Sequence, residues 1–147
     1  MTLKVAFVCV GNSARSQMAE GLTRYWVKKL NLPVEVYSAG SNPIGYIHPL
    51  AIRVMRERGI DISRQRSKHL REIPLRELDF VFVLCREEDC PYIPYGRVVN
   101  WHLPDPAGFE GTVEERLEFF RRVRDAIEER ILDFLKKVER GEINPKG

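Results

Sequence analysis

The chain has 147 residues, 44% of them hydrophobic, a size and composition typical of one compact domain. Its net charge of +3, from 24 Lys and Arg against 21 Asp and Glu, argues against a nucleic-acid partner. There is no apolar run of about eighteen residues and no signal-peptide pattern at the start, so we expect no membrane partner. These features predict a cytoplasmic protein with one domain, residues 1–147.

The first half of the chain predicts two strands and two helices in alternation. Residues 3–9 are a short apolar run, as in a strand that is buried on both faces. Apolar residues then recur at helical spacing from Met18 to Leu30, before a stop signal at 31–33. A second strand is expected at 34–38. After a turn-rich stretch, a helix is expected at 49–58, with Gly59 as its C-terminal signal.

The second half continues the alternation. We expect a short helix at 67–73, an apolar strand at 79–85 and a shorter strand at 97–100. The longest helix is predicted from Thr112 to about Val138, and residues 139–147 are expected to fray. Strands that alternate with helices predict an α/β fold, in which a mostly parallel sheet has helices on both faces. Ligands of such sheets bind beyond the carboxyl ends of the strands.

The segment CVGNSARS follows the first strand at such an end and has a cysteine, five residues and an arginine. Backbone N–H groups of such a loop can converge on an oxyanion, and the helix that follows adds its positive dipole end. We expect Gly11 to let the backbone curl, and Arg15 to hold two oxygens through its guanidinium. The predicted oxyanion-binding residues are Val10, Gly11, Asn12, Ser13, Ala14, Arg15 and Ser16.

The same positive environment favours the thiolate form of Cys9, which makes this residue a candidate nucleophile. Ser16 is placed to donate a hydrogen bond to the sulfur, and Asn12 to hold the loop in shape. The alternative is that Cys9 is a buried strand-end cysteine and Arg15 an exposed helix residue. An apolar strand that ends at the cysteine, with a helix that begins inside the motif, favours the functional interpretation.

The chain has three cysteines, Cys9, Cys85 and Cys90, without the paired spacing of a structural zinc site. An odd number favours neither a disulfide framework nor a metal. For a cytoplasmic protein, redox chemistry, nucleophilic chemistry or plain burial remain open. We expect no cofactor and no metal.

Four segments occur in the order FVCVGNSARSQMAEG, VYSAG, RGIDIS and DPAG. In this order they resemble the low-molecular-weight tyrosine phosphatase superfamily and, within it, the thioredoxin-coupled arsenate reductases, over about residues 3–135. Gln17 follows Ser16 where phosphatases usually have proline. Ala107 and Gly108 stand where phosphatases commonly have aromatic residues, and Ala14 where many have a second loop cysteine. These departures look like the reductase branch.

The resemblance implies a three-layer, flavodoxin-like fold with a four-stranded parallel sheet of order 2-1-3-4, so that Cys9 and Cys85 end neighbouring strands within or near disulfide range. It implies that Cys9 attacks arsenate while Asp105 acts as general acid. Cys85 then attacks Cys9 and arsenite leaves. Finally Cys90 attacks Cys85, and a thioredoxin-like or other dithiol protein reduces the Cys85–Cys90 disulfide.

The spacer between Cys85 and Cys90 is shorter than is common in this reductase family. A regular helix would separate the two Cα atoms by about 7.5 Å, beyond the limit of about 6.8 Å for a disulfide. A disulfide therefore requires a non-helical segment, which Pro91 favours. The alternative is that Cys90 is a loop thiol with no part in a relay.

Some reductases of the family bind potassium through four residues, of which Asn12, Glu20 and Ser38 match three, but Lys68 stands in the fourth place. Because an ammonium group disfavours a neighbouring cation, we predict no potassium site. Asp105 could also serve only in a rigid turn. We assign no chemistry to His48, His69 and His102. The aromatic residues are expected in the core or in cleft walls, and these are Tyr46, Tyr92, Tyr95 and Trp101.

Three functions therefore remain. The preferred one is arsenate reduction, with Cys9, Arg15, Asp105, Cys85 and Cys90 as the catalytic set and an arsenate or phosphate oxyanion as ligand. The alternative is a protein tyrosine phosphatase that forms a phosphocysteine at Cys9, and some phosphatase activity is expected in either case. The third is a non-catalytic phosphate-binding or redox-sensing domain.

Overall fold

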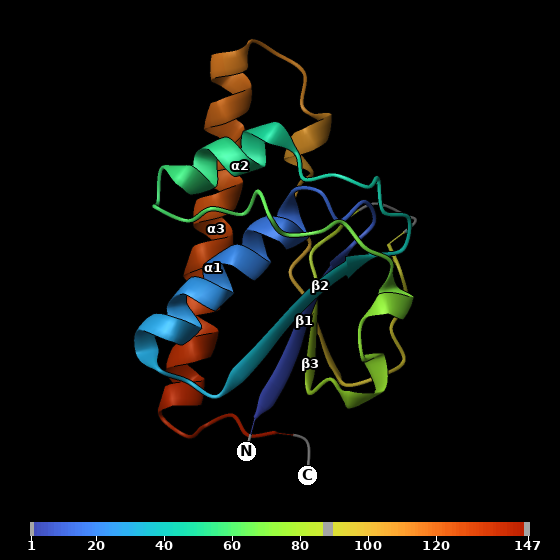
Figure 1. The fold of residues 1–147 in the computed structure, drawn as a ribbon, viewed down its shortest axis with the longest axis vertical. Helices are drawn as coiled ribbons and strands as arrows, with labels where there is room; N and C mark the ends of the chain where they lie inside the picture. Colours follow the sequence, from blue (N-terminus) through green and yellow to red (C-terminus); the bar gives the residue numbers. More distant parts are fainter. Residues whose placement is uncertain (1, 87–89, 146–147) are drawn as a thin grey trace.

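The computed structural model describes residues 2–86 and 90–145. Its centre is a four-stranded, fully parallel sheet in the order β2-β1-β3-β4 (Figure 1). The strands are β1 (Leu3–Cys9), β2 (Val34–Gly40), β3 (Phe80–Val83) and β4 (Arg97–Asn100). The predicted α/β class and the strand order 2-1-3-4 are thus confirmed.

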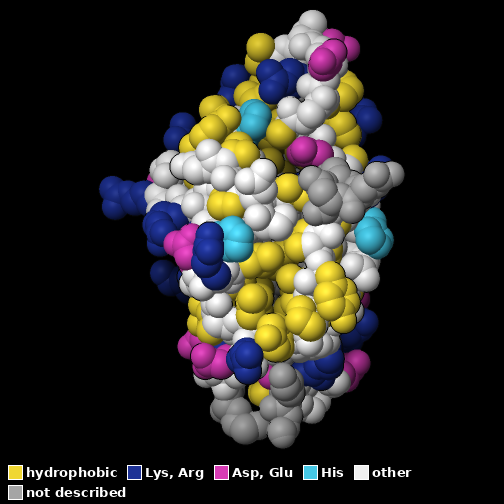
Figure 2. Space-filling model, turned by 90° about the vertical axis from the view of Figure 1, so that its right-hand side faces the viewer, with side chains coloured by type: hydrophobic (Ala, Val, Ile, Leu, Met, Phe, Trp, Pro, Cys, Tyr) yellow, Lys and Arg dark blue, Asp and Glu magenta, His cyan; other side chains and the backbone are white. Residues whose placement is uncertain are grey.

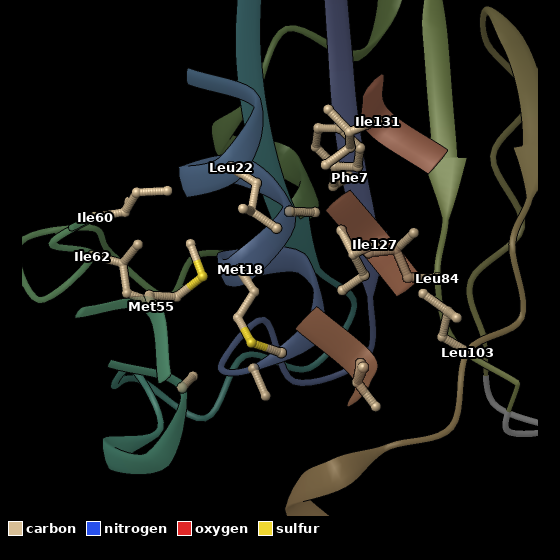
Figure 3. Close-up of a cluster of buried hydrophobic side chains, with 14 of the residues drawn as sticks. Phe7, Met18, Leu22, Met55, Ile60, Ile62, Leu84, Leu103, Ile127 and Ile131 are labelled. Carbon is tan, nitrogen blue, oxygen red and sulfur yellow. The ribbon is translucent and has the colours of Figure 1, made fainter. Parts of the chain in front are cut away.

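Three α-helices pack together on one face of the sheet and lie to its left in Figure 1. They are α1 (Arg15–Leu30), α2 (Pro49–Arg56) and α3 (Val113–Glu139). Side chains from β1 and from all three helices meet in one buried cluster, whose centre is shown in Figure 3. Phe7, Leu22 and Ile127 are fully or almost fully buried there. Burial of each such side chain contributes roughly 1.5–3 kcal/mol.

The opposite face of the sheet is covered more thinly. Ala6, Val8 and Val81 form a second buried cluster on this side. Its cover consists of the 3₁₀ helices η1 (Leu70–Glu72) and η2 (Leu75–Glu77), together with the segment after Cys90. The predicted helix at 67–73 is therefore wrong, because only one short 3₁₀ turn forms there, capped by His69. Both faces are covered, as predicted, but α-helices cover only one.

Element boundaries differ from the predictions by a few residues. The second strand continues to Gly40 instead of ending at 38, because it keeps its parallel pairing with β1 as far as Cys9. The third strand is limited to Phe80–Val83. The second helix ends at Arg56, and Gly59 adopts a positive φ of 73° after it. None of the helices in residues 2–86 and 90–145 has the length and hydrophobicity needed to span a bilayer.

The chain after α3 turns back towards the sheet. The Arg97 guanidinium donates a hydrogen bond of 2.7 Å to the carbonyl of Asn144, and Ile143 packs against the main buried cluster. These contacts lie within the stretch predicted to fray, 139–147, whose last two residues are outside the described part. Fraying of the chain end stays a prediction.

Candidate active site

The loop between β1 and α1 forms one wall of a pocket at the carboxyl ends of the strands, as predicted. The pocket has a volume of about 370 Å³. Its opposite walls come from the segment after β2 and from the 3₁₀ helix η3 (Pro106–Gly108). The lining residues are Cys9, Val10, Gly11, Asn12, Ser13, Ala14, Arg15, Asn42, Ile44, Asp105, Ala107 and Gly108. All the predicted oxyanion-binding residues except Ser16 therefore face the same space.

The Cys9 thiol lies at the floor of this pocket and is only 3% exposed. The backbone N–H of Asn12 donates to its sulfur over 3.3 Å. The hydroxyl oxygen of Ser16 lies 2.8 Å from the same sulfur. Ser16 is fully buried behind the thiol, so its position suits the predicted hydrogen bond to Cys9 rather than contact with an oxyanion. The sulfur thus accepts from the Asn12 N–H and lies within hydrogen-bond distance of the Ser16 hydroxyl.

Arg15 begins α1, but its side chain turns inward and is only 3% exposed. Its Nη1 donates to the carbonyl of Leu103 over 2.9 Å. Its Nη2 lies 3.9 Å from Oδ2 of Asp105. The alternative of an exposed helix arginine is wrong, because the guanidinium is anchored at the pocket. The sequence did not predict this role of Leu103, because every residue has a backbone carbonyl and the residue type does not indicate which one accepts.

Asp105 uses its two carboxylate oxygens differently. Oδ1 accepts a hydrogen bond of 3.0 Å from the backbone N–H of Ala107 and so caps η3. Oδ2 faces Arg15 across the pocket, and the side chain is 41% exposed. The turn interpretation of Asp105 is therefore correct, yet it does not exclude the catalytic one. A carboxyl group at the mouth of the pocket can exchange protons with both water and a bound oxyanion.

The tight curl of the loop depends on Asn12 and Gly40 rather than on Gly11. Asn12 has a positive φ of 47°, a conformation that asparagine adopts more readily than most residues. A Cβ on Gly11 would meet no atom closer than 3.5 Å, whereas a Cβ on Gly40 would lie 2.3 Å from the carbonyl oxygen of Val10. The role predicted for Gly11 thus belongs to Gly40, in the VYSAG segment of β2. Sequence reasoning gave this glycine no role.

A network of buried polar side chains lies behind the loop. The backbone N–H of Lys68 donates to Oδ1 of Asn12 over 2.9 Å, which fixes the orientation of that amide. Nδ2 of Asn12 consequently donates to Ser16 and Ser38, at 2.8 and 3.1 Å. Ser38 in turn donates to Glu20 over 2.5 Å. Because Asn12 donates to the Ser16 oxygen, the Ser16 proton is free to point at the Cys9 sulfur.

The three residues that match a potassium site, Asn12, Glu20 and Ser38, are thus joined by this network. The ammonium group of Lys68 lies 3.7 Å from Glu20 and donates to the carbonyl of Arg66 over 2.8 Å. Burial lowers the pKa of Lys68 below its ordinary value, although the Glu20 carboxylate partly opposes this. A group of three or more His, Cys, Asp or Glu residues able to hold a metal is absent from residues 2–86 and 90–145.

Cys85 and Cys90 form a disulfide, with a Cα separation of 5.8 Å, and Cys9 is a free thiol. Residues 87–89 between them lie outside the described part, but the separation is within the range for a disulfide. The short spacer therefore permits the predicted pairing. Cys85 is completely buried in the same apolar cluster as Cys9. Cys9 ends β1, whereas β3 ends at Val83, so Cys85 follows its strand by two residues instead of ending it as predicted.

The histidines make structural contacts. His48 accepts from the backbone N–H of Leu50 and so caps α2, His69 caps η1, and Nδ1 of His102 lies 3.2 Å from the carbonyl of Cys85. Trp101 packs on Phe82, as expected of a core residue. Tyr46 lines a pocket with Ile47 and Ile52, as expected of a cleft wall. Tyr92, however, is 87% exposed, so the prediction that it lies in the core or in a cleft wall is wrong.

Comparisons with known proteins identify the family of this chain. The model of the family described as low molecular weight phosphotyrosine protein phosphatase matches residues 4–143. A protein of Bacillus licheniformis named arsenate reductase is 46% identical over 134 residues, which cover 88% of this chain and 93% of the relative. A solved structure described as an arsenate reductase in the phosphate binding state has a TM-score of 0.78 and 35% identity, over 92% of this chain and 98% of that one.

A further solved structure is of an enzyme described as thioredoxin-dependent. The thioredoxin-dependent arsenate reductase of Corynebacterium glutamicum has a TM-score of 0.69 and 31% identity. The match covers 95% of this chain and 63% of that one.

Proposed function

This chain belongs to the low molecular weight phosphotyrosine protein phosphatase family, and we propose that within it the chain works as an arsenate reductase. The observation that carries the proposal is the Cys85–Cys90 disulfide in the same buried cluster as the free thiol of Cys9. A phosphatase needs only the cysteine of the loop. A reductase needs two further thiols to take up the oxidation that arsenate delivers.

In the first step, arsenate enters the pocket and its oxygens are held by Arg15 and by backbone N–H groups of the loop. The Cys9 thiolate attacks arsenic and forms a sulfur–arsenic bond. One arsenate oxygen leaves as water, with Asp105 as the source of a proton. Ala107 and Gly108 line the pocket with small side chains, which suits a small inorganic anion.

In the second step, the Cys85 thiolate attacks the Cys9 sulfur. The electron pair of the sulfur–arsenic bond goes to arsenic, which leaves as arsenite, and a Cys9–Cys85 disulfide remains. Cys90 then attacks Cys85 and releases the Cys9 thiolate. Two thiols are oxidised to one disulfide while arsenate gains two electrons, so the electrons balance. A free Cys9 beside a Cys85–Cys90 disulfide is the product expected from this sequence.

Regeneration requires an external dithiol. Cys85 has no exposed surface, whereas Cys90 is partly exposed. An incoming thiol therefore reaches the sulfur of Cys90, and Cys85 is the leaving thiolate. A thioredoxin-like protein is the natural candidate for the reductant, because the structurally similar enzyme of Corynebacterium glutamicum is described as thioredoxin-dependent.

The second candidate function is phosphate ester hydrolysis. Cys9, Arg15 and Asp105 face one pocket, and the same set can form a phosphocysteine that water then hydrolyses. This reaction requires neither Cys85 nor Cys90. We expect it as a slower activity of the same site.

Turnover of arsenate and hydrolysis of p-nitrophenyl phosphate, measured side by side, separate the two functions. Cys9→Ser is expected to abolish both activities, whereas Cys85→Ser and Cys90→Ser abolish only catalytic arsenite formation in the presence of thioredoxin. With arsenate and no reductant, Cys90→Ser should accumulate a Cys9–Cys85 disulfide, detectable by peptide mass spectrometry. If Cys85→Ser and Cys90→Ser both keep full arsenate turnover, the relay is refuted and the phosphatase function stands.

A further inference from the structure

The sheet face without α-helices carries an apolar surface beside the disulfide. Figure 2 shows this side of the molecule, with hydrophobic side chains gathered over the middle of it. Leu70 of η1, Leu75 of η2 and Cys90 are partly exposed and pack on the same buried cluster. Tyr95 belongs to this side too, since the Arg76 guanidinium lies over its ring at 5.5 Å. We call Leu70, Leu75, Cys90, Tyr92 and Tyr95 the disulfide-side patch.

Tyr92 is the most exposed member of the patch. Its neighbour Ile93 is only 6% exposed and anchors the segment in the buried cluster beneath. Tyr92 itself points outward and is 87% exposed, more than any other large hydrophobic side chain in residues 2–86 and 90–145. The side chain is two residues from Cys90. An aromatic side chain held outward on an anchored segment is a common form of a binding hot spot, because it buries a large area at low entropic cost.

The chemistry of the disulfide determines what can occupy this surface. Reduction requires a partner sulfur to approach Cys90 along the sulfur–sulfur bond, since Cys85 is completely buried. Any protein that supplies this sulfur must cover the surface around Cys90. We propose that the disulfide-side patch docks the dithiol protein that reduces Cys85–Cys90, with Tyr92 as its principal anchor. This inference rests on the proposed function, because it assumes that the disulfide is reduced in turnover.

The reaction on the docked partner is a two-step exchange. A partner thiolate attacks the Cys90 sulfur, forms a mixed disulfide and expels Cys85 as a thiolate. The second thiol of the partner then attacks the partner's own sulfur and releases Cys90. The partner becomes oxidised to a disulfide, and both thiols of this chain are restored.

The test measures reduction of the disulfide itself, without arsenate. The oxidised full-length chain is mixed with a bacterial thioredoxin or with dithiothreitol, and free thiols are counted over time by alkylation and mass spectrometry. For Tyr92→Ser, we expect the second-order rate constant with thioredoxin to fall about tenfold. The rate constant with dithiothreitol should stay within about twofold of wild type, since the small reagent needs no docking surface. Tyr92→Phe, which keeps the ring, should behave like wild type.

Tyr46→Ser is the matched control, because Tyr46 is also an exposed tyrosine but lies outside the patch. It should leave both rate constants unchanged. The proposal is overturned if Tyr92→Ser slows both reductants equally, if it slows neither, or if thioredoxin fails to reduce the wild-type disulfide that dithiothreitol reduces. A failure of the proposed function looks different: the disulfide is reduced by thioredoxin, yet no arsenite forms when arsenate is added.

Discussion

The ammonium group of Lys68 lies 3.7 Å from a carboxylate oxygen of Glu20, directly behind the loop that holds Cys9. Glu20 is 4% exposed and receives the Ser38 hydroxyl, while the backbone of Lys68 fixes the amide of Asn12. A positive side chain of the protein is thus built into the polar network behind the nucleophile. Because the Lys68 ammonium group would repel a bound cation, we keep the prediction that no potassium ion binds here.

Lys68→Met should lower both stability and activity, because it removes a cation from a buried carboxylate. We expect a loss of roughly 1–3 kcal/mol in the free energy of unfolding, since Arg24 still pairs with Glu20 and limits the damage. Cys9 alkylation should slow as well, because Ser38 and Asn12 lose part of their support. Urea unfolding and the rate of iodoacetamide labelling measure the two effects.

Lys137→Met is the control, since Lys137 forms an exposed pair with Asp133 on α3. Loss of such a pair costs about 0.5 kcal/mol or less. Equal effects of the two substitutions would show that the Lys68–Glu20 pair contributes no more to stability and to Cys9 reactivity than an exposed ion pair does.

Gly40→Ala should distort the anion-binding loop. The new Cβ would lie 2.3 Å from the carbonyl oxygen of Val10 and 3.1 Å from Cβ of Asn12, and neither belongs to a flexible side chain. We expect a loss of about 1–3 kcal/mol or more in the free energy of unfolding, as for overpacked cores. Phosphate affinity, measured by calorimetry, should fall at least about tenfold.

Gly108→Ala tests whether any added methyl group near the pocket has this effect. A Cβ at Gly108 would meet no atom within 4 Å, so thermal stability should remain close to wild type. A Gly40→Ala protein with normal phosphate affinity would contradict the close approach described above.

The sequence predicted the fold well where the apolar pattern of a whole segment was typical of one kind of secondary structure. The apolar residues 3–9 and the periodic apolar residues of 112–138 mark β1 and α3 without reference to the rest of the chain. The predicted helix at 67–73 failed because its residues are held by partners far along the chain: the Lys68 N–H by Asn12 and the Lys68 carbonyl by Gly40. The sequence near residues 67–73 does not indicate hydrogen-bond partners that lie so far along the chain.

The same distinction applies to the site. Cys9, Arg15 and Asp105 were found because a motif or a resemblance names their side chains, and the pocket brings them together. Leu103 and Gly40 were missed, since one contributes a carbonyl and the other the absence of a side chain. Those two roles depend on three-dimensional proximity alone.

Ser16→Ala should reduce the reactivity of Cys9. The Ser16 hydroxyl lies 2.8 Å from the sulfur, and a hydrogen bond to a charged group contributes roughly 1.5–3 kcal/mol. We expect the rate constant for iodoacetamide at neutral pH to fall about tenfold or more. Arsenate and phosphate should protect Cys9 from the reagent in the wild type, which a redox-sensing domain without an anion site would not show.

Thr23→Val offers a matched control on the same helix. Thr23 is 1% exposed, and its hydroxyl has no hydrogen-bond partner among the residues that the structure describes. Its replacement should leave Cys9 labelling unchanged. If Ser16→Ala labels as fast as Thr23→Val, the hydroxyl of Ser16 does not support the thiolate.

His48→Asn should make the stability of the protein less sensitive to mild acid. Burial lowers the pKa of His48 below its ordinary value of 6.5, and Arg116 lowers it further, although Asp105 opposes this. The unfolded chain therefore takes up a proton at a higher pH than the folded chain does. Stability from this group is complete above about pH 6.5 and is lost as the pH falls towards the lower folded value.

The loss has a structural cause, because Nδ1 of His48 accepts the backbone N–H of Leu50 over 3.1 Å, which a protonated ring nitrogen cannot do. Asparagine keeps a cap acceptor without titrating, so the variant should match wild type within about 0.5 kcal/mol at about pH 7.5. At about pH 5.5 it should be the more stable of the two. Urea unfolding at both pH values measures the difference, and parallel losses in both proteins would assign the acid sensitivity to other groups.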